Sequence, residues 1–157
     1  MIFQRINRTD AEKVFAIFQN VAGATITANY PACWTGSSID GIRVTKPATA
    51  LLSTFVGIAN ADIADSAYGL FQVYGYRASA LVTNDTSQAV AAGDILIPVN
   101  AQWYLDYSAA GDGKSGFIYA GEAFATDATP AAVNQKVLIR ALSVLMSMGI
   151  ASVALLG

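Results

Sequence analysis

The sequence predicts an all-β fold, a single-domain antiparallel β-sandwich or barrel of roughly nine to eleven short strands with little helix. Short apolar runs recur along the chain, and Gly, Pro, Asn and Asp separate them at spacings typical of antiparallel sheets. In several runs the larger apolar residues alternate, the period of a half-buried strand, whereas helical periodicity is scarce. A chain of 157 residues fits one domain, residues 1–157, and no repeat of roughly 20 to 50 residues is evident.

The first strand is expected within residues 9–20. Thr9 and Glu12 match a capping box, so a helix is the alternative. The run over residues 14–18 is rich in aromatic and β-branched side chains, which suit a pleated surface, and we therefore favour the strand. A second short strand is expected around Ile26.

The middle of the chain continues the pattern. Residues 29–38 are expected to form a loop, because Pro31, Gly36 and two serines are loop-forming. Residues 41–47 predict a short strand that Pro47 ends, and an apolar run follows. Residues 70–74 and 76–82 predict two strands separated by Gly75, where we expect a bulge or a close backbone approach.

The later strands show clear alternation. Pro98, within the apolar run of residues 95–99, indicates an edge strand. Trp103, Leu105 and Tyr107 share one face of a half-buried strand. A strand is expected at residues 117–120, and the final strand opens with Val137, Ile139 and Ala141 on one face and Lys136 and Arg140 on the other.

Residues 141–157 carry no charge. Their length lies at the lower limit of about 17 to 25 residues for a spanning helix. Leu142, Val144, Met146, Met148 and Ile150, however, alternate with mostly smaller residues. This segment is therefore predicted to form a strand that pairs within the sheet or with a neighbouring subunit, and no membrane contact is expected.

The composition points to surface that is buried against partners. Charged residues make up 13% of the chain, hydrophobic residues 54%, and the mean hydropathy is +0.44. This charge is too sparse to solvate a monomer's whole surface, which favours an assembly or a membrane. The net charge of −2, with the basic residues scattered, makes direct binding of nucleic acid improbable.

The chain lacks the usual catalytic groups. It has no histidine, and its one cysteine, Cys33, is expected in the core and can form neither an intramolecular disulfide nor a thiolate cluster. Asp62 and Asp65 are neighbours in a loop of small residues, where capping of turns is the commoner role. Residues 108–115 resemble a phosphate-binding loop, but a strand-like run follows where that motif needs a helix. We therefore predict no enzyme, no cofactor and no metal site.

Four aromatic residues suggest an alternative function. Clustered aromatic side chains at the spacing of a β-strand usually form cross-strand pairs in the core, but exposed aromatic rings can also stack on sugars or bases. The residues concerned are Trp103, Tyr104, Tyr107 and Phe117. We favour the core role and keep a carbohydrate-binding or adhesive β-module as the second hypothesis.

Several glycine-centred strings resemble the decoration proteins of tailed-bacteriophage heads. The longest covers residues 57–75, with Tyr68, Gly69 and Gln72, and is followed by a second string at residues 91–98 that begins Ala-Ala-Gly-Asp. The strings at residues 10–15 and 40–47 are similar to that family as well. The resemblance implies a small β-rich module that binds the assembled capsid shell and cements it, commonly as a trimer.

The leading hypothesis is therefore a capsid decoration or cement protein, located on the capsid surface of the virion. Its partners would be the major capsid protein and further copies of this chain, in the homotrimer that the resemblance implies. A membrane-anchored β-domain is the third hypothesis. Six apolar residues near the two ends are predicted to form subunit contacts: Phe3, Ile6, Val144, Met146, Met148 and Ile150.

Overall fold

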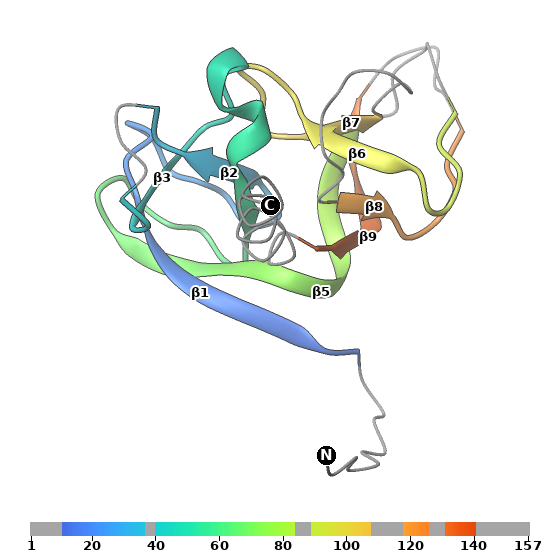
Figure 1. Cartoon of the computed structure of the whole chain (residues 1–157), viewed down its shortest axis with the longest axis horizontal. Coiled ribbons are helices and arrows are strands. Elements are labelled where there is room, and N and C mark those ends of the chain that lie inside the picture. The colour runs from blue at the N-terminus through green and yellow to red at the C-terminus, as the bar shows by residue number, and fades with distance from the viewer. Residues whose placement is uncertain (1–10, 37–39, 84–88, 108–117, 126–130, 141–157) are drawn as a thin grey trace, which may run out of the picture.

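The computed structural model describes residues 11–36, 40–83, 89–107, 118–125 and 131–140. These residues form nine strands and one 3₁₀ turn, which confirms the predicted all-β fold with little helix (Figure 1). The elements in chain order are β1 (Lys13–Asn20), β2 (Pro31–Trp34), β3 (Arg43–Thr45), η1 (Thr49–Thr54), β4 (Phe55–Ala59), β5 (Tyr68–Thr83), β6 (Ile95–Pro98), β7 (Leu105–Tyr107), β8 (Ile118–Ala120) and β9 (Ala132–Ile139).

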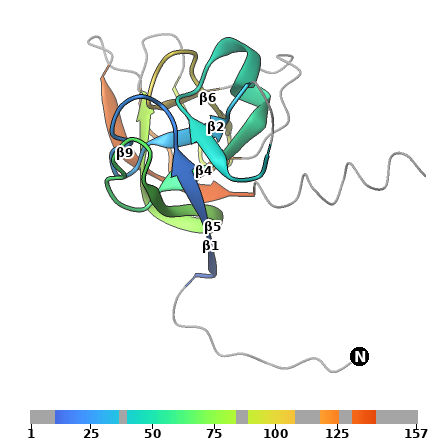
Figure 2. The same ribbon diagram turned by 90° about the vertical axis from the view of Figure 1, so that its left-hand side faces the viewer.

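The nine strands form one sheet that closes on itself twice. The first ring runs β1-β3-β2-β4-β5 and closes because β5 also pairs with β1, beside which it lies in Figure 2. The second ring runs β5-β7-β6-β8-β9 and closes through pairing of β9 with β5. Strand β5 belongs to both rings, and in Figure 1 it runs below the first and then bends upward beside the second. Closure leaves few strand edges open within the described residues.

The sheet is antiparallel, as predicted, apart from one parallel pair in each ring. In the first ring Gln19 of β1 pairs in parallel with Arg43 of β3, and in the second Val82 of β5 pairs in parallel with Leu105 of β7. The other pairings are antiparallel. A ring of five strands requires this, because strand direction cannot alternate around an odd number of strands without one repetition.

The buried apolar residues form two clusters, one for each ring. The first is built around Phe71 of β5 and Phe18 of β1. The second is built around Leu96, Leu105 and Ile139 and also takes up residues from β4. Because β4 and β5 contribute to both clusters, the two cores share their central strands.

The two rings have the same topology and form an internal structural repeat. In each ring an isolated bridge joins the two long connections, between Ile26 and Ile63 in the first and between Val90 and Phe124 in the second. The bridge residues of the second ring follow those of the first by 64 residues (Ile26 to Val90) and by 61 residues (Ile63 to Phe124). This offset is longer than the repeat lengths considered from the sequence. Strand β5 ends the first unit and begins the second.

The turn before the second strand of each ring repeats as well. The N–H of Asn29 donates to the carbonyl of Ala59 at 3.0 Å, and the N–H of Gly93 donates to the carbonyl of Ala120 at 2.7 Å. Both donors have positive φ, 73° at Asn29 and 93° at Gly93. The same left-handed turn therefore leads into β2 and β6.

Strand β5 is continuous through Gly75, where two separate strands were predicted. It has one extra residue opposite β1, at Val73, and one opposite β9, between Arg77 and Ala80. Such bulges bend a strand, which allows β5 to serve both rings. The close approach expected at Gly75 is confirmed, since a Cβ there would lie 1.9 Å from the carbonyl oxygen of Glu12.

Two other predictions are corrected. Part of the predicted loop at residues 29–38 is β2, in which Ala32 and Cys33 are fully buried between β3 and β4. Its proline, Pro31, is the first residue of the strand, a position that proline tolerates. Strand β6 is not an edge strand, but β8 pairs only with its first two residues, so Pro98 lies where one side of the strand is unpaired.

The ends of the described region follow the predictions. Residues 13–20 form strand β1 and not a helix, and Val137 and Ile139 of β9 are buried while Lys136 is exposed. Ile26 forms only an isolated bridge instead of a strand. The predicted strand at residues 141–157 and the phosphate-like segment at residues 108–115 lie outside the described residues.

Candidate functional site

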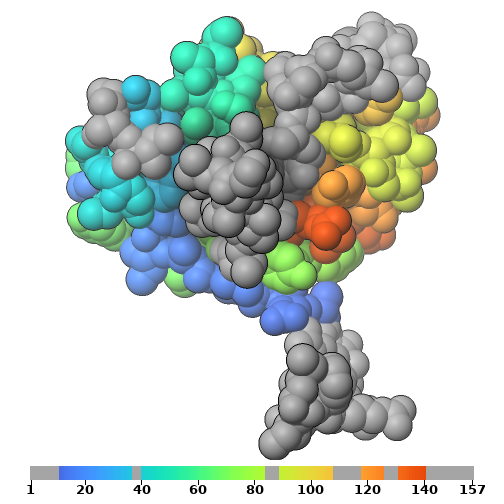
Figure 3. All heavy atoms as spheres, viewed as in Figure 1, coloured from blue at the N-terminus to red at the C-terminus, as the bar shows by residue number. Residues whose placement is uncertain are grey.

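The outer face of the β1–β5 pair carries an exposed cluster of large apolar side chains, which we call the apolar ribbon: Phe15 and Ile17 of β1, and Tyr68 and Leu70 of β5. Ile17 and Leu70 are direct cross-strand partners, and Phe15 and Tyr68 follow at alternate positions on the same face. Ile17 is 64% exposed and Tyr68 62%. The blue and green atoms of these strands line the lower border of the molecule in Figure 3.

Most of the exposed large apolar side chains of the described residues lie on this ribbon. Seven large apolar side chains are exposed among the described residues, and four of them form the ribbon. The inward-facing neighbours Phe18 and Phe71 fill the core of the first ring, so both faces of this strand pair are apolar. Exposed apolar residues that form a contiguous patch mark interaction surfaces, whereas scattered ones need no explanation.

The second ring provides an internal comparison. Counted back from the bridge residues Ile26 and Val90, Ile17 corresponds to Leu81, which is half-buried and pairs with the exposed Asn134. Lys136 is exposed further along β9, where Leu138 is an exposed apolar residue. The same topology therefore forms with an outer face that mixes polar and apolar residues, so a continuous apolar ribbon is not a requirement of the fold.

A pocket of about 200 Å³ adjoins the apolar ribbon and shares Phe15 with it. It forms where β1 passes β5 beside the bulges. Its lining combines two cationic side chains, two carboxamides, one hydroxyl and two apolar residues: Lys13, Arg77, Asn60, Gln72, Ser79, Phe15 and Ala78. Among the lining residues there is no carboxylate.

Arg77 is the buried cation of this pocket, with 7% of its surface exposed. Its Nη2 donates to the carbonyl of Ala59 and to Oδ1 of Asn29, both at 2.8 Å. Its Nε donates to the carbonyl of Ser79 at 2.6 Å, and Nη1 donates to Oε1 of Gln72 at 3.3 Å. All four acceptors are uncharged. Burial lowers the pKa of the Arg77 guanidinium, which nevertheless stays charged at neutral pH.

Two of the four candidate aromatic residues, Trp103 and Tyr107, lie against the cores. Trp103 packs on the first cluster and stacks on Tyr30, with ring centroids 5.3 Å apart, while Lys46 Nζ lies 5.4 Å from the Trp103 ring. Tyr107 packs on the second cluster. The core role favoured for these two residues is thus confirmed, and their rings already have partners where a sugar would stack. Phe117 lies outside the described residues.

The two neighbouring aspartates hold loops, as predicted. Oδ1 of Asp62 accepts the N–H of Ala28 at 2.8 Å, and Oδ1 of Asp65 accepts the N–H of Gly23 at 2.9 Å. Asn20, which is fully buried, joins the same two connections by donating to the carbonyls of Ala24 and Ile63. Within the described ranges, no three His, Cys, Asp or Glu side chains gather as metal ligands.

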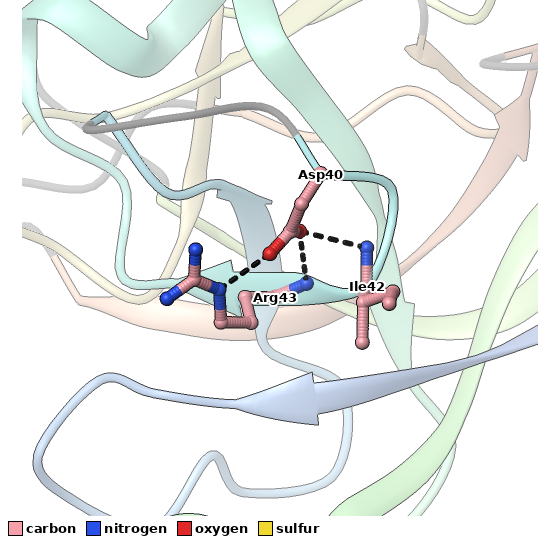
Figure 4. A network of polar contacts seen from close by, with 3 residues as sticks. All are labelled: Asp40, Ile42 and Arg43. Atoms are coloured by element: carbon pink, nitrogen blue, oxygen red, sulfur yellow. Dashed lines mark hydrogen bonds and ion pairs between the residues drawn. The ribbon is translucent and has the colours of Figure 1, made fainter.

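Cys33 and Asp40 show opposite effects of their surroundings on pKa. Burial raises the pKa of the Cys33 thiol to about 12, so this side chain is an inert core residue, as predicted. Asp40 accepts the N–H groups of Arg43 and Ile42 at 2.9 Å and the Nε of Arg43 (Figure 4). These hydrogen bonds lower the pKa of Asp40 to about 2.

The predicted subunit contacts Phe3, Ile6, Val144, Met146, Met148 and Ile150 lie outside the described residues. The apolar ribbon was not predicted as a site. A signal for it was present, since all five residues from Val14 to Phe18 are apolar and a strand with one wet face alternates instead. The described part of the chain contains no helix with the length and hydropathy to span a bilayer.

Comparison with known proteins gives little. No family model matches this chain, and no curated protein matches it in sequence. One solved structure that it resembles is the N base of head fiber gp8.5 in bacteriophage phi29, at 13% identity and a TM-score of 0.45, covering 82% of this chain and 94% of that one. A similarity of this size does not establish a common fold.

Proposed function

We propose that this chain is a structural virion protein that binds the outside of an assembled phage capsid and stabilises it. Its partner is the major capsid protein, and the bound form is a homotrimer. The observation that carries the proposal is the apolar ribbon, because it is a contiguous apolar surface on a face where the second ring carries polar residues as well. The trimer rests on the resemblance of residues 57–75 and 91–98 to phage decoration proteins.

The chemistry of the ribbon suits a lasting contact between proteins. Aromatic side chains are enriched at the centres of interfaces, and the ribbon offers Phe15 and Tyr68 on two rigid, paired strands. A low share of charged residues, 13%, lets such a face be buried without stranding charges. A symmetric trimer would present three ribbons to the shell, so that several weak contacts act together.

The second candidate function, a carbohydrate-binding or adhesive module, finds less support. Sugar stacking needs an aromatic ring with a free face in a concave site. Trp103 is stacked on Tyr30 and approached by Lys46, and Tyr107 packs on the core. Tyr68 is exposed, but it lies on the outward face of a strand pair rather than in the pocket.

The test compares particles with and without this protein. We expect particles that carry it to rupture at a higher temperature, and we expect light scattering to give a trimer for the free chain. Leu70→Lys, on the ribbon, should abolish co-sedimentation with assembled shells, because it places a charge in the buried contact. Leu138→Lys is the matched control, because it makes the same change at an exposed leucine that lies on the second ring and outside the ribbon.

Three outcomes contradict the proposal. Equal rupture temperatures, or a chain that does not sediment with shells, would remove the cement function and leave the adhesive module. If Leu70→Lys and Leu138→Lys weaken sedimentation equally, the contact does not lie on the ribbon. Circular dichroism of both variants verifies that each remains folded.

A further inference from the structure

The pocket beside the apolar ribbon has the chemistry of an anion site. Lys13 lies at its exposed margin and Arg77 is buried, while Asn60 and Gln72 supply carboxamides and Ser79 a hydroxyl. None of its lining residues is acidic. Any charged group that enters this pocket therefore meets two positive charges and no negative one.

Arg77 has no charged partner within the described part of the chain. Its four hydrogen bonds go to two backbone carbonyls and two carboxamide oxygens. A guanidinium carries five N–H donors, so one hydrogen on Nη1 has no acceptor among the described residues. A buried charge without an opposite charge is costly, and an incoming anion would offset that cost.

The size and the walls of the pocket narrow the ligand. About 200 Å³ holds a short side chain but lies below the range of about 300 to 1,000 Å³ that is typical of small-molecule sites. Phe15 and Ala78 provide apolar contacts that suit methylene groups, and a guanidinium matches the planar geometry of a carboxylate. An aspartate or glutamate side chain meets each of these conditions.

We propose that this pocket binds the carboxylate of an Asp or Glu side chain on the protein that covers the apolar ribbon. The inference rests on the proposed function for its source, the capsid shell, and on the pocket alone for its chemistry. Phe15 lines both surfaces, so one partner that buries the ribbon also reaches the pocket. The carboxylate would fix the register of a contact whose area is otherwise apolar and non-directional.

The first arm of the test uses the free chain with sodium acetate as the probe, followed by the backbone amide signals in NMR. We expect acetate to shift the amides of Lys13, Gln72, Arg77 and Ser79 saturably, and sodium chloride at the same ionic strength to leave them in place. Lys13→Glu should weaken acetate binding about five- to tenfold, because it removes an attraction and adds a repulsion. Lys46→Glu makes the same change of charge away from the pocket and should leave the affinity unchanged.

Arg77 itself is a poor test residue, because it also holds the fold together, whereas Lys13 is exposed at the start of β1. If chloride shifts the same amides as acetate, or if acetate binds Lys13→Glu as it binds the wild-type chain, the pocket is not a carboxylate site. Both results overturn the proposal without relying on any partner.

The second arm uses assembled shells. We expect Lys13→Glu to reduce co-sedimentation several-fold and Lys46→Glu to leave it unchanged. If Leu70→Lys abolishes sedimentation while Lys13→Glu does not affect it, the function stands and the pocket takes no part. If the wild-type chain binds acetate but not shells, the carboxylate chemistry is supported and the shell is excluded as its source.

Discussion

Gly75 of β5 lies against Glu12 so closely that a Cβ at position 75 would stand 1.9 Å from the Glu12 carbonyl oxygen. Its φ of +96° is also one that residues with side chains rarely adopt. This contact is where β1 crosses the bend of β5 between the two rings. We expect Gly75→Ala to destabilise the protein by roughly 3 kcal/mol or more in denaturant unfolding. The backbone of Glu12 would have to move away from the new Cβ, and the alanine would also have to adopt a strained positive φ.

Gly93 separates the cost of the positive φ from the cost of the contact with Glu12. It has almost the same backbone, with φ of +93°, but no atom lies within 4 Å of a Cβ built there. We expect Gly93→Ala to cost only the conformational strain, about 1 to 2 kcal/mol. Equal losses for the two variants would show that the Glu12 contact contributes nothing.

Removal of the Arg77 side chain tests how far its hydrogen bonds stabilise the fold. Arg77→Met should lower the free energy of unfolding by at least about 3 kcal/mol, because the carbonyls of Ala59 and Ser79 lose their donor. Arg43→Met is the control, since the ion pair of Arg43 with Asp40 is exposed, and should cost less than about 1 kcal/mol. Urea unfolding measures the free energy of unfolding of both variants. A loss for Arg77→Met as small as that for Arg43→Met would contradict a stabilising role of the Arg77 hydrogen bonds.

Cys33 should be unreactive in the folded protein. Its pKa rises from 9.0 to about 12, so almost no thiolate forms at pH 8, and the side chain is fully buried. We expect no labelling by iodoacetamide under native conditions and complete labelling in concentrated denaturant. The sign of the pKa change means that this thiol stabilises the fold below pH 9 and that the contribution is lost as the pH rises towards 12. Rapid native labelling would show that the first ring opens.

Asp40 provides a test at acid pH. Its pKa is lowered from 3.8 to about 2, first by the Arg43 N–H, then by the Ile42 N–H and then by the Arg43 side chain. The ionised carboxylate therefore favours the folded state above about pH 4, and this contribution is lost as the pH falls through 2. Because the two leading causes are backbone groups, the pKa in Arg43→Ala should rise only part of the way to 3.8. A carbon-13 NMR titration of the carboxyl group measures this, and a full return to 3.8 would contradict it.

Local structure could be predicted from the amino-acid sequence. Alternating apolar residues predict β9 and the half-buried strand around Leu105, because a strand with one face in the core needs period two. Aromatic and β-branched residues predict β1, because such side chains suit a pleated surface. Gly75 was recognised as a close approach, Cys33 as a core residue, and Asp62 and Asp65 as residues that hold loops. Each of these follows from the chemistry of one residue type in its immediate neighbourhood.

Which strands pair with one another depends on the tertiary structure. Two five-stranded rings that share β5, and the parallel pair that each odd ring requires, depend on pairings between residues far apart, such as Gln19 with Arg43. The sequence signals a strand with two apolar faces at residues 14–18, but not which face lies in a core and which meets solvent. Packing of Phe18 and Phe71 into the first ring settles that choice and leaves Ile17 and Leu70 outside. The burial and the contacts of Arg77 likewise could not be predicted from the sequence. They arise because the bend of β5 brings Asn29, Ala59 and Lys13 around the side chain, and burial is a property of the folded chain.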